Sequence, residues 1–302
     1  MTLQPPSAGS SPVPAVPLAT LTTMRRGKGT GSNRYFAKPS GYLSVAVLVI
    51  FAFTGIFGPM LVERPSGLGG DILQSPSMAH IFGTDDLGQD VFAQVVWGTR
   101  VSLIVGVVAS IIAIVIGTTL GLIGAYVKKL DPIVTTLTDV MLSLPLLPLM
   151  ILVTALAGPS VTTLTIVIGV LSWAEVARLI RSNGMVVSAM PYIDGARVLG
   201  AGPGRIIATE IFPAVVPLIV VSVLLTAARA VISEAGLSFL GMGDPSSWSW
   251  GRILLNAQRS GVLATAWWQT LFPSLAILLL VLAATIAGIR YNDSRDPRTK
   301  GL

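Results

Sequence analysis

The chain contains no cysteine and a single histidine, and only 11% of its residues are charged. The absence of cysteine excludes disulfides, thiolate metal sites and cysteine nucleophiles. Soluble domains carry about 25% charged residues. The low charge, the 52% of hydrophobic residues and the mean hydropathy of +0.78 therefore exclude an ordinary soluble domain and indicate an integral membrane protein.

The sequence also lacks a Gly-x-x-x-x-Gly-Lys-Ser/Thr motif, so the chain does not bind ATP through a P-loop. The net charge is +6, but the basic residues flank apolar runs and do not gather on one soluble face. This pattern is typical of the signal that keeps cytoplasmic loops of membrane proteins inside. We expect the lipid bilayer, and no nucleic acid, as a partner.

Six apolar runs are each close to the ~20 residues that a helix needs to cross a bilayer. They cover residues 42–62, 101–126, 133–157, 161–181, 214–233 and 270–290. The sequence thus predicts an all-α fold of six transmembrane helices in one membrane domain, residues 41–292. Pro145 and Pro148 are expected to kink the third helix, and Pro159 is expected to mark an outer turn.

Polar segments flank the predicted membrane domain on both sides. Residues 1–40 are rich in Pro, Ser, Thr and Gly and carry five basic residues, which predicts a disordered cytoplasmic tail. Residues 293–302 are the predicted cytoplasmic C-terminal tail. With both termini inside, the basic residues left in spans or outside are Arg64, Arg100, Arg229, Arg252 and Arg259.

A polar island at residues 188–212 separates the fourth and fifth apolar runs. Pro191 can start a helix there, because proline is tolerated in the first turn, and Asp194 favours the positive end of the helix dipole. Gly200 and the run 202–204 (Gly-Pro-Gly) then stop or bend the helix. The segment 188–206 is therefore a candidate cytoplasmic lever, and an ordinary turn between two spans is the alternative.

Two further motifs lie in the predicted outer loops, residues 63–100 and 234–269. The first reads Gly-Thr-Asp-Asp-Leu-Gly-Gln-Asp over residues 83–90. The second reads Glu-Ala-Gly-Leu-Ser-Phe-Leu-Gly over residues 234–241 and continues as Ser-Trp-Gly-Arg over residues 249–252.

These motifs, taken with residues 194–213, resemble the C-type permease subunits of the dipeptide, oligopeptide and nickel ABC importers. The run Asp-Gly-Ala at 194–196, with Gly200 and the run Ile-Phe-Pro at 211–213, is similar to the EAA loop of that family, which reads Glu-Ala-Ala. Gln89 stands where the outer motif of the family has Arg. The resemblance covers about residues 40–300 and implies a type I ABC importer permease fold in a bacterial-type cytoplasmic membrane.

The resemblance also implies a complex. A second, B-type permease subunit would pair with this chain, two ABC ATPase subunits would bind ATP and Mg²⁺ beneath it, and an extracytoplasmic solute-binding protein would deliver the solute. The chain itself would be a pore subunit without enzyme activity or a cofactor of its own. The implied ATPase-coupling residues are Asp194, Gly195, Ala196, Arg197, Gly200, Ile211 and Pro213.

Charged residues in or beside the apolar runs are further candidates, because a charged side chain that faces lipid is costly. Asp139, Arg229 and Glu234 are candidates for the translocation path, and Arg229 lies deepest in its span. An alternative for Asp139 and Glu175 is a position near the cytoplasmic end, paired with a basic residue such as Arg178.

The outer motif brings acidic residues close to the lone His80, and oxygen ligands could hold a hard cation. Asp and Gly are also common turn formers, so we predict no metal site here. The expected role is a shaped cap that meets the second permease or the binding protein. The outer-motif candidates are Gly83, Thr84, Asp85, Gly88 and Asp90.

The predicted function is the membrane-spanning permease subunit of an ATP-driven importer for di- or oligopeptides or similar solutes. An ion-coupled secondary transporter is the alternative, and it should show internal repeats and broken helices at matching positions in its two halves. The sequence leaves open whether the solute is a dipeptide, a longer peptide, a metal chelate or another compound.

Overall fold

The computed structural model describes residues 39–67, 70–262 and 265–295. These residues form helices and connecting loops, with one isolated bridge between Thr84 and Asp90. Five helical segments are long and apolar enough to cross a membrane, and one bent helix pair makes a sixth. The prediction of an all-α membrane fold with six spans is confirmed.

Most of the described chain lies in helices, and two π-helical turns flank α10. In chain order the elements are α2 (Pro39–Leu61), α3 (Val91–Tyr126), α4 (Asp131–Ser143), α5 (Leu146–Ala157), α6 (Val161–Leu171), α7 (Trp173–Ser188), α8 (Pro191–Val198), α9 (Pro203–Ile206), the π-turn η2 (Ile207–Ile211), α10 (Phe212–Leu237), the π-turn η3 (Ser238–Met242), α11 (Trp250–Arg259) and α12 (Trp268–Arg295).

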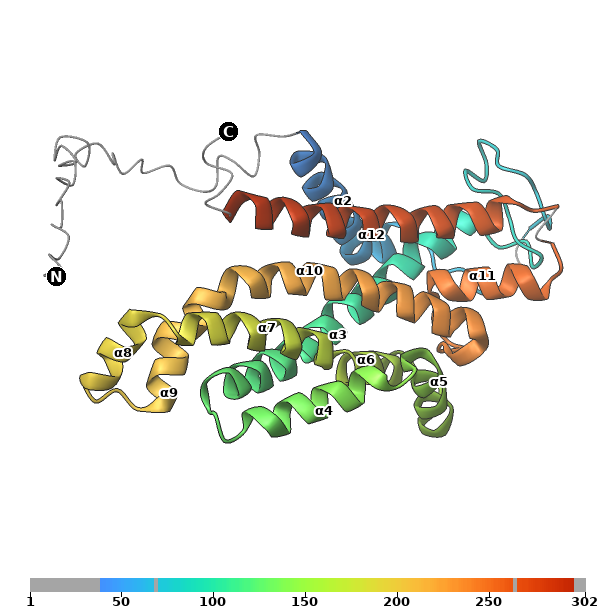
Figure 1. Ribbon diagram of the computed structural model, residues 1–302. Coiled ribbons are helices and arrows are strands. Elements are labelled where there is room, and N and C mark those ends of the chain that lie inside the picture. The colour runs from blue at the N-terminus through green and yellow to red at the C-terminus, as the bar shows by residue number, and fades with distance from the viewer. Residues whose placement is uncertain (1–38, 68–69, 263–264, 296–302) are drawn as a thin grey trace, which may run out of the picture.

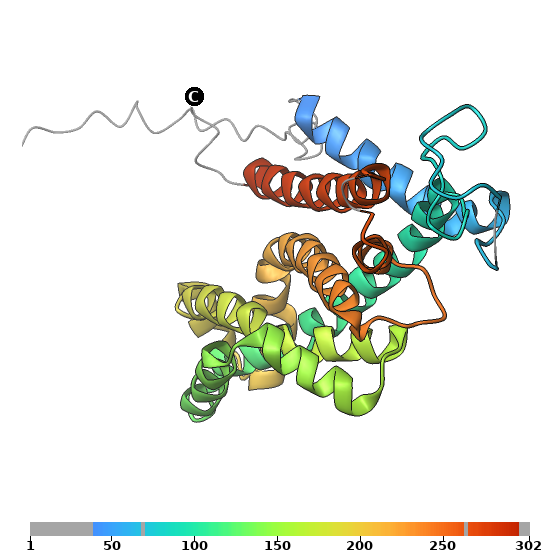
Figure 2. The ribbon, with the colours of Figure 1, turned by 90° about the vertical axis from the view of Figure 1, so that its right-hand side faces the viewer.

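The helices form two groups on either side of α10. Figures 1 and 2 show α2 and α12 side by side on one side of the molecule, with α4 to α7 on the other. The long helix α3 crosses the molecule and contacts both groups. Large apolar side chains such as Phe53, Leu278 and Leu282 are exposed on α2 and α12, which suits contact with lipid.

The second span starts earlier than the sequence predicts. Helix α3 begins at Val91, so the predicted outer loop 63–100 ends at Asp90. The Asp90 carboxylate accepts hydrogen bonds from the backbone N–H groups of Phe92 (2.7 Å) and Ala93 (3.1 Å), which makes it the N-cap of α3. At 36 residues the helix is ~54 Å long and extends beyond the ~30 Å hydrocarbon core.

Glycines on α3 allow a close approach to α7. A Cβ atom on Gly117 would lie 2.7 Å from the carbonyl oxygen of Trp173, and one on Gly121 would lie 2.8 Å from that of Ala177. Both glycines are buried against α7, as small residues at helix contacts in membranes commonly are. The close contact that the Gly-x-x-x-Gly step permits is therefore realised, and its partner is α7.

The third span is broken where the sequence predicts a kink. Helices α4 and α5 meet at an angle of 85°, and the break lies at Leu144 and Pro145. Leu144 has an extended backbone (φ −78°, ψ 141°), because the ring of a following proline disfavours the helical conformation. The expectation of one kinked helix at residues 133–157 is thus wrong. Gly158, with φ +88°, then makes the turn that Pro159 was expected to mark.

The fifth span is longer than predicted at both ends. It runs as one helical segment from Pro203 to Met242, so Pro213 does not begin it. Pro213 lacks an N–H group and its ring crowds the preceding turn, and the chain takes the wider π-turn η2 immediately before it. The predicted outer loop 234–269 also contains a helix, α11.

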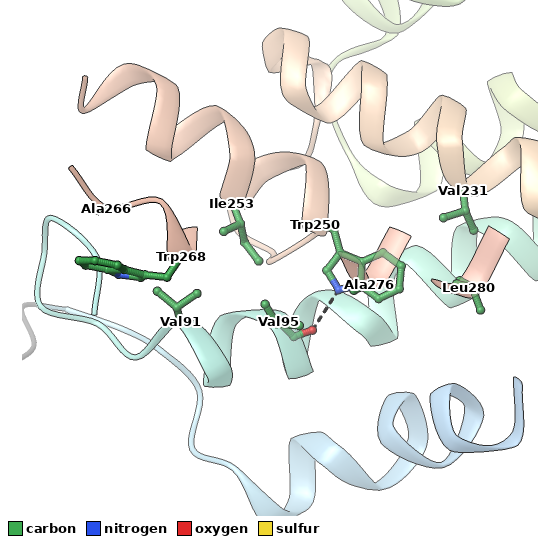
Figure 3. Close-up of a cluster of buried hydrophobic side chains, with 9 residues drawn as sticks. All are labelled: Val91, Val95, Val231, Trp250, Ile253, Ala266, Trp268, Ala276 and Leu280. Atoms are coloured by element: carbon green, nitrogen blue, oxygen red, sulfur yellow. Dashed lines mark hydrogen bonds between the residues drawn. The ribbon is translucent and has the colours of Figure 1, made fainter. Parts of the chain in front are cut away.

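A buried apolar cluster joins α3, α10, α11 and α12 at the end of the molecule that carries the predicted outer loops (Figure 3). Its centre is Trp250, which is fully buried and whose indole N–H donates to the carbonyl oxygen of Val95 (3.1 Å). Trp268 and Val91 close the cluster on the side of the residue 70–90 loop. The loops of this end are therefore packed against the membrane helices.

The two described ends of the chain lie close together. The Arg290 guanidinium donates to the Ser40 hydroxyl (3.1 Å), which brings the start of α2 to the end of α12. Helix α12 continues through Arg295, into the predicted tail 293–302, and α2 begins at Pro39, within the predicted tail 1–40. The rest of both predicted tails lies outside the described residues.

Gly251 provides a stability test of the packed outer end. A Cβ atom there would collide with the backbone of Ala235, so we expect Gly251→Ala to lower the free energy of unfolding by about 1–3 kcal/mol. Gly236, on the same helix as Ala235, has open space around it. Gly236→Ala should leave stability unchanged or raise it by up to about 1 kcal/mol. Thermal unfolding of both variants in detergent distinguishes the two, and equal melting temperatures would contradict the close contact.

Candidate functional site

The polar island between the fourth and fifth spans folds as two short helices, and the interruption between them includes Gly200, where the sequence predicts a stop or a bend. Helix α8 starts at Pro191, with Asp194 in its first turn, as the sequence predicts. It ends at Gly200, whose φ is +82°. There the N–H of Ala201 donates to the carbonyl of Ala196 (3.1 Å) and the N–H of Gly200 to that of Arg197 (3.0 Å). This is the Schellman arrangement, which requires a left-handed residue and so explains Gly200.

Helix α8 is anchored on one face and bare at its tip. Ile193 is fully buried and packs in a cluster with Ile206 and Ile211. Val198 and Leu199, at the C-terminal end of the helix, are 87% and 89% exposed. Figure 1 shows α8 and α9 at one end of the molecule, beyond the ends of the neighbouring long helices.

The predicted coupling residues divide between this exposed surface and the interior. Arg197 donates to the Asp194 carboxylate (2.6 Å) and to the hydroxyl of Tyr126 (3.2 Å), and its guanidinium lies 5.2 Å from the ring centre of Tyr126. The hydrogen bond to Tyr126, followed by the charge of Asp194, raises the pKa of Arg197, so the residue stays charged. Five of these residues are exposed: Asp194, Gly195, Arg197, Gly200 and Pro213. Ala196 is half-buried, and Ile211 is buried.

Asp139 and Glu175 pair with arginines of α7 and α10. Arg178 on α7 binds Asp139 on α4 (2.6 Å), which confirms the pairing expected as one alternative. Arg229 on α10 binds Glu175 on α7. The sequence indicated that both residues need a polar environment, but it did not pair them with each other.

Glu175 and Arg229 line a cavity of about 270 Å³. It lies beside the 85° break between α4 and α5 and beside Ser172, where α6 ends and α7 begins. Asp139 and Glu234 do not line this cavity. Of the three path candidates, Arg229 alone is therefore part of it.

Glu234 lies in the interior of the bundle. Its carboxylate is fully buried and accepts hydrogen bonds from the hydroxyls of Ser102 on α3 (2.9 Å) and Ser238 (2.7 Å). The side chain thus cross-links the outer halves of α3 and α10. Ser102 lies 132 residues away in sequence, so no local pattern could have indicated this contact.

The first outer motif is a closely packed loop. Thr84 is buried, its hydroxyl bonds to the Asp71 carbonyl (2.8 Å), and its own carbonyl accepts from the Trp268 indole (3.0 Å). Gly83 and Gly88 both have φ above +70°, a conformation that favours glycine. These residues shape the loop, and its role as a cap stays a prediction.

Asp85 holds the same loop from inside. One carboxylate oxygen accepts from the N–H groups of Leu87 (2.9 Å) and Gln89 (2.8 Å), and the other accepts from the Gln94 amide (2.5 Å). Burial raises the pKa of Asp85, against the lowering effect of these hydrogen bonds. His80 binds Asp90 (2.9 Å), and the described residues contain no group of three or more His, Cys, Asp or Glu side chains placed to hold a metal.

Two arginines of the outer surface form no ion pair with any residue that the structure describes. Arg252 donates to the Ser247 carbonyl (2.8 Å) and lies 5.0 Å from the ring centre of Trp248. Arg64 lies 5.8 Å from the ring centre of Trp97 and donates to a backbone carbonyl. Burial lowers the pKa of Arg252.

Comparison with known proteins places the chain among transport proteins. Residues 117–301 match the family model described as "binding-protein-dependent transport system inner membrane component". The match includes α4 to α12 and the C-terminal third of the second span.

Individual relatives match over most of their length. The glutathione transport system permease protein GsiD of Pectobacterium atrosepticum is 37% identical over 75% of this chain and 75% of its own. The dipeptide transport system permease protein DppC of Alkalihalophilus pseudofirmus is 34% identical over 85% and 86%. DppC of Bacillus subtilis is 33% identical over 86% and 82%.

The raised pKa of Asp85 leads to a pH prediction. The folded state favours the protonated carboxyl of Asp85. The contribution of this carboxyl to the stability of the fold is therefore complete below its ordinary pKa of 3.8, and it is lost as the pH rises through the raised pKa of the folded state. Asp85→Asn keeps an acceptor oxygen for the two N–H groups but cannot ionise. We expect thermal unfolding from about pH 4 to 8 to show the wild type losing stability relative to this variant. A difference that does not change with pH would contradict the prediction.

The buried position of Glu234 leads to a second prediction. Gln can exchange hydrogen bonds with the same serine hydroxyls, so Glu234→Gln should change the free energy of unfolding by less than about 1 kcal/mol. Glu234→Ala leaves Ser102 and Ser238 without this partner and should cost about 1–3 kcal/mol or more. Chemical unfolding in detergent measures both variants, and equal losses for Gln and Ala would argue against the hydrogen bonds.

Proposed function

Because the chain belongs to the family of binding-protein-dependent transport system inner membrane components, we propose that it is the permease subunit of an ATP-driven ABC importer for di- or oligopeptides or similar solutes. The chain is a multi-pass membrane protein. It forms half of the translocation path in a bacterial-type cytoplasmic membrane, with both termini in the cytoplasm. The relatives named for dipeptide and glutathione transport support short peptides as the solute.

The single observation that carries the coupling role is the bare apolar tip of α8. Val198 and Leu199 are almost fully exposed at the end of a helix that is itself fixed by the buried Ile193. Removing exposed apolar side chains from water by contact with a partner is favourable. Helix α8 would therefore fit a groove of an ABC ATPase subunit and transmit its movement to the membrane helices.

The residues of the EAA-like loop take different parts in this proposal. Asp194, Gly195, Ala196, Arg197 and Gly200 form or shape the helix that meets the ATPase. Behind it, Ile211 anchors the loop by its burial, and Pro213 fixes the wide turn at the start of α10. These two positions act through the fold and not through contact with the ATPase.

The side of the bundle formed by α4, α7 and α10, which carries the Asp139–Arg178 and Glu175–Arg229 pairs, is proposed to face the translocation path. Arg229 and Asp139 are half-exposed within spans, and charged groups at such positions face protein or water and not lipid. A second, B-type permease subunit would cover this side. Glu234, which is buried behind it, would keep the path's wall rigid.

The outer end is the proposed docking surface of an extracytoplasmic solute-binding protein. The packed motif of Gly83, Thr84, Asp85, Gly88 and Asp90 gives this end a fixed shape. The charges of Arg64 and Arg252 are not neutralised by ion pairs within the described ranges, so acidic residues of the binding protein would complement them.

ATP and Mg²⁺ are assigned to the two ATPase subunits, because this chain lacks a P-loop sequence. The permease itself would then catalyse no reaction and hold no cofactor. An ion-coupled secondary transporter remains the alternative function, and the family match weighs against it.

The apolar tip gives a direct test of the coupling role. Leu199→Asp should leave the fold intact, since the side chain is exposed, but should put an unpaired charge in the ATPase groove. We expect a tagged Leu199→Asp permease, isolated from its native membrane in mild detergent, to retain the second permease. The amount of co-purified ATPase subunits should fall about tenfold or more.

Met78→Asp is the matched control, because Met78 is an equally exposed apolar residue at the opposite, outer end. It should retain the ATPase subunits. If the wild-type chain purifies without any ATPase, or if uptake stops with a protonophore while ATP is maintained, the importer proposal is wrong and the ion-coupled transporter takes its place.

A further inference from the structure

The cavity beside Glu175 and Arg229 combines features of a small-molecule site. It lies next to two helix interruptions, the break between α4 and α5 and the α6–α7 junction at Ser172. Interrupted helices in transporters expose backbone groups that bind solutes and ions. Leu144, Leu146 and other apolar side chains form the remaining wall, so polar and apolar surfaces face each other across the cavity.

The polar wall contains both signs of charge and an unused hydroxyl. Glu175 and Arg229 bind each other across α7 and α10, and both are half-exposed. Thr226, one turn before Arg229, is only 2% exposed and lines the cavity, yet its hydroxyl has no hydrogen-bond partner among the described residues. The hydroxyl oxygen of Thr226 is itself shielded from solvent, so the half-exposed Glu175–Arg229 pair is the polar group that a solute can reach in this cavity.

We propose that this cavity is a transit site for a zwitterionic solute, whose carboxylate binds Arg229 and whose ammonium group binds Glu175. The inference rests on the proposed importer function and specifies which solutes the permease itself favours. A solute with a single charge would separate Glu175 from Arg229 and leave one of them unpaired, which is costly once the proposed second permease covers this side of the bundle. A zwitterion exchanges one ion pair for two.

The size and energetics of the site suit passage of a short solute. Small-molecule pockets usually measure about 300–1,000 Å³, so a cavity of about 270 Å³ accommodates a dipeptide backbone better than a long peptide. Because the solute must displace an existing ion pair, its binding is weak. A transport site requires this, since the solute has to leave again.

The first test removes both charges of the cavity at once. The importer is reconstituted in vesicles with its ATPase subunits and binding protein, and uptake of radiolabelled alanyl-alanine is measured. We expect Glu175→Gln/Arg229→Gln to reduce uptake about tenfold or more, with co-purification of the subunits and ATP hydrolysis unchanged. The matched control is Asp131→Asn/Arg181→Gln, which neutralises another ion pair of α7 outside the cavity and should leave uptake within about twofold.

The second test asks whether charge recognition is the cause. Arg229→Gln removes the proposed carboxylate ligand but keeps Glu175, so the uptake ratio of alanyl-alanine amide to alanyl-alanine should rise about tenfold over the wild-type ratio. Any preference of the binding protein for one of the two solutes is the same with the wild-type chain and with the Arg229→Gln variant. It therefore cancels when the two uptake ratios are compared.

The results separate this proposal from the importer proposal. The transit site is overturned if Arg229→Gln leaves the uptake ratio of alanyl-alanine amide to alanyl-alanine unchanged. It is also overturned if the control double variant loses as much uptake as the Glu175→Gln/Arg229→Gln variant. The Glu175–Arg229 pair would then only hold α7 and α10 together. In both cases the wild type still takes up peptide with ATP. If the wild type shows no ATP-dependent uptake of any peptide, the importer proposal fails first.

Discussion

The close contact between α3 and α7 is the interaction on which the rest of this structure depends. Gly117 and Gly121 let the backbones of the two helices approach so closely that a Cβ atom at either position would collide with a carbonyl oxygen of α7. This contact fixes α7, a helix of 16 residues that carries Glu175 near its first residue and leads into α8 after its last. The cavity and the bare tip of α8 thus lie at opposite ends of one helix.

The placement of charge divides the bundle into a lipid side and a polar side. The exposed side chains of α2 and α12 within the spans are mainly apolar, whereas α4, α7 and α10 carry the ion pairs. A charge in a bilayer avoids lipid, so the side with Asp139 and Arg229 requires protein or water as its neighbour.

The two ends of the molecule differ in how firmly they are held. At the end that carries α11, Trp250, Asp85 and Glu234 each have their polar atoms bound inside the protein and join α3 to α10, α11 and the residue 70–90 loop. At the other end, α8 is attached mainly through Ile193 and the Arg197 contacts. The end that carries α11 is therefore tied together by more buried hydrogen bonds than the end that carries α8.

The sequence by itself determined the membrane class, the number of spans and the limits of α8, since span length, proline and glycine act locally. Pro191 and Gly200 set the start and end of α8 wherever the helix lies. The composition also marked Glu175, Arg229 and Glu234 as groups that cannot face lipid. Only the tertiary structure decided their partners, because Glu175 and Arg229 lie 54 residues apart and Ser102 and Glu234 lie 132 apart. Hydrophobic patterns show that a polar group needs a partner, whereas helix packing decides which residue that partner is.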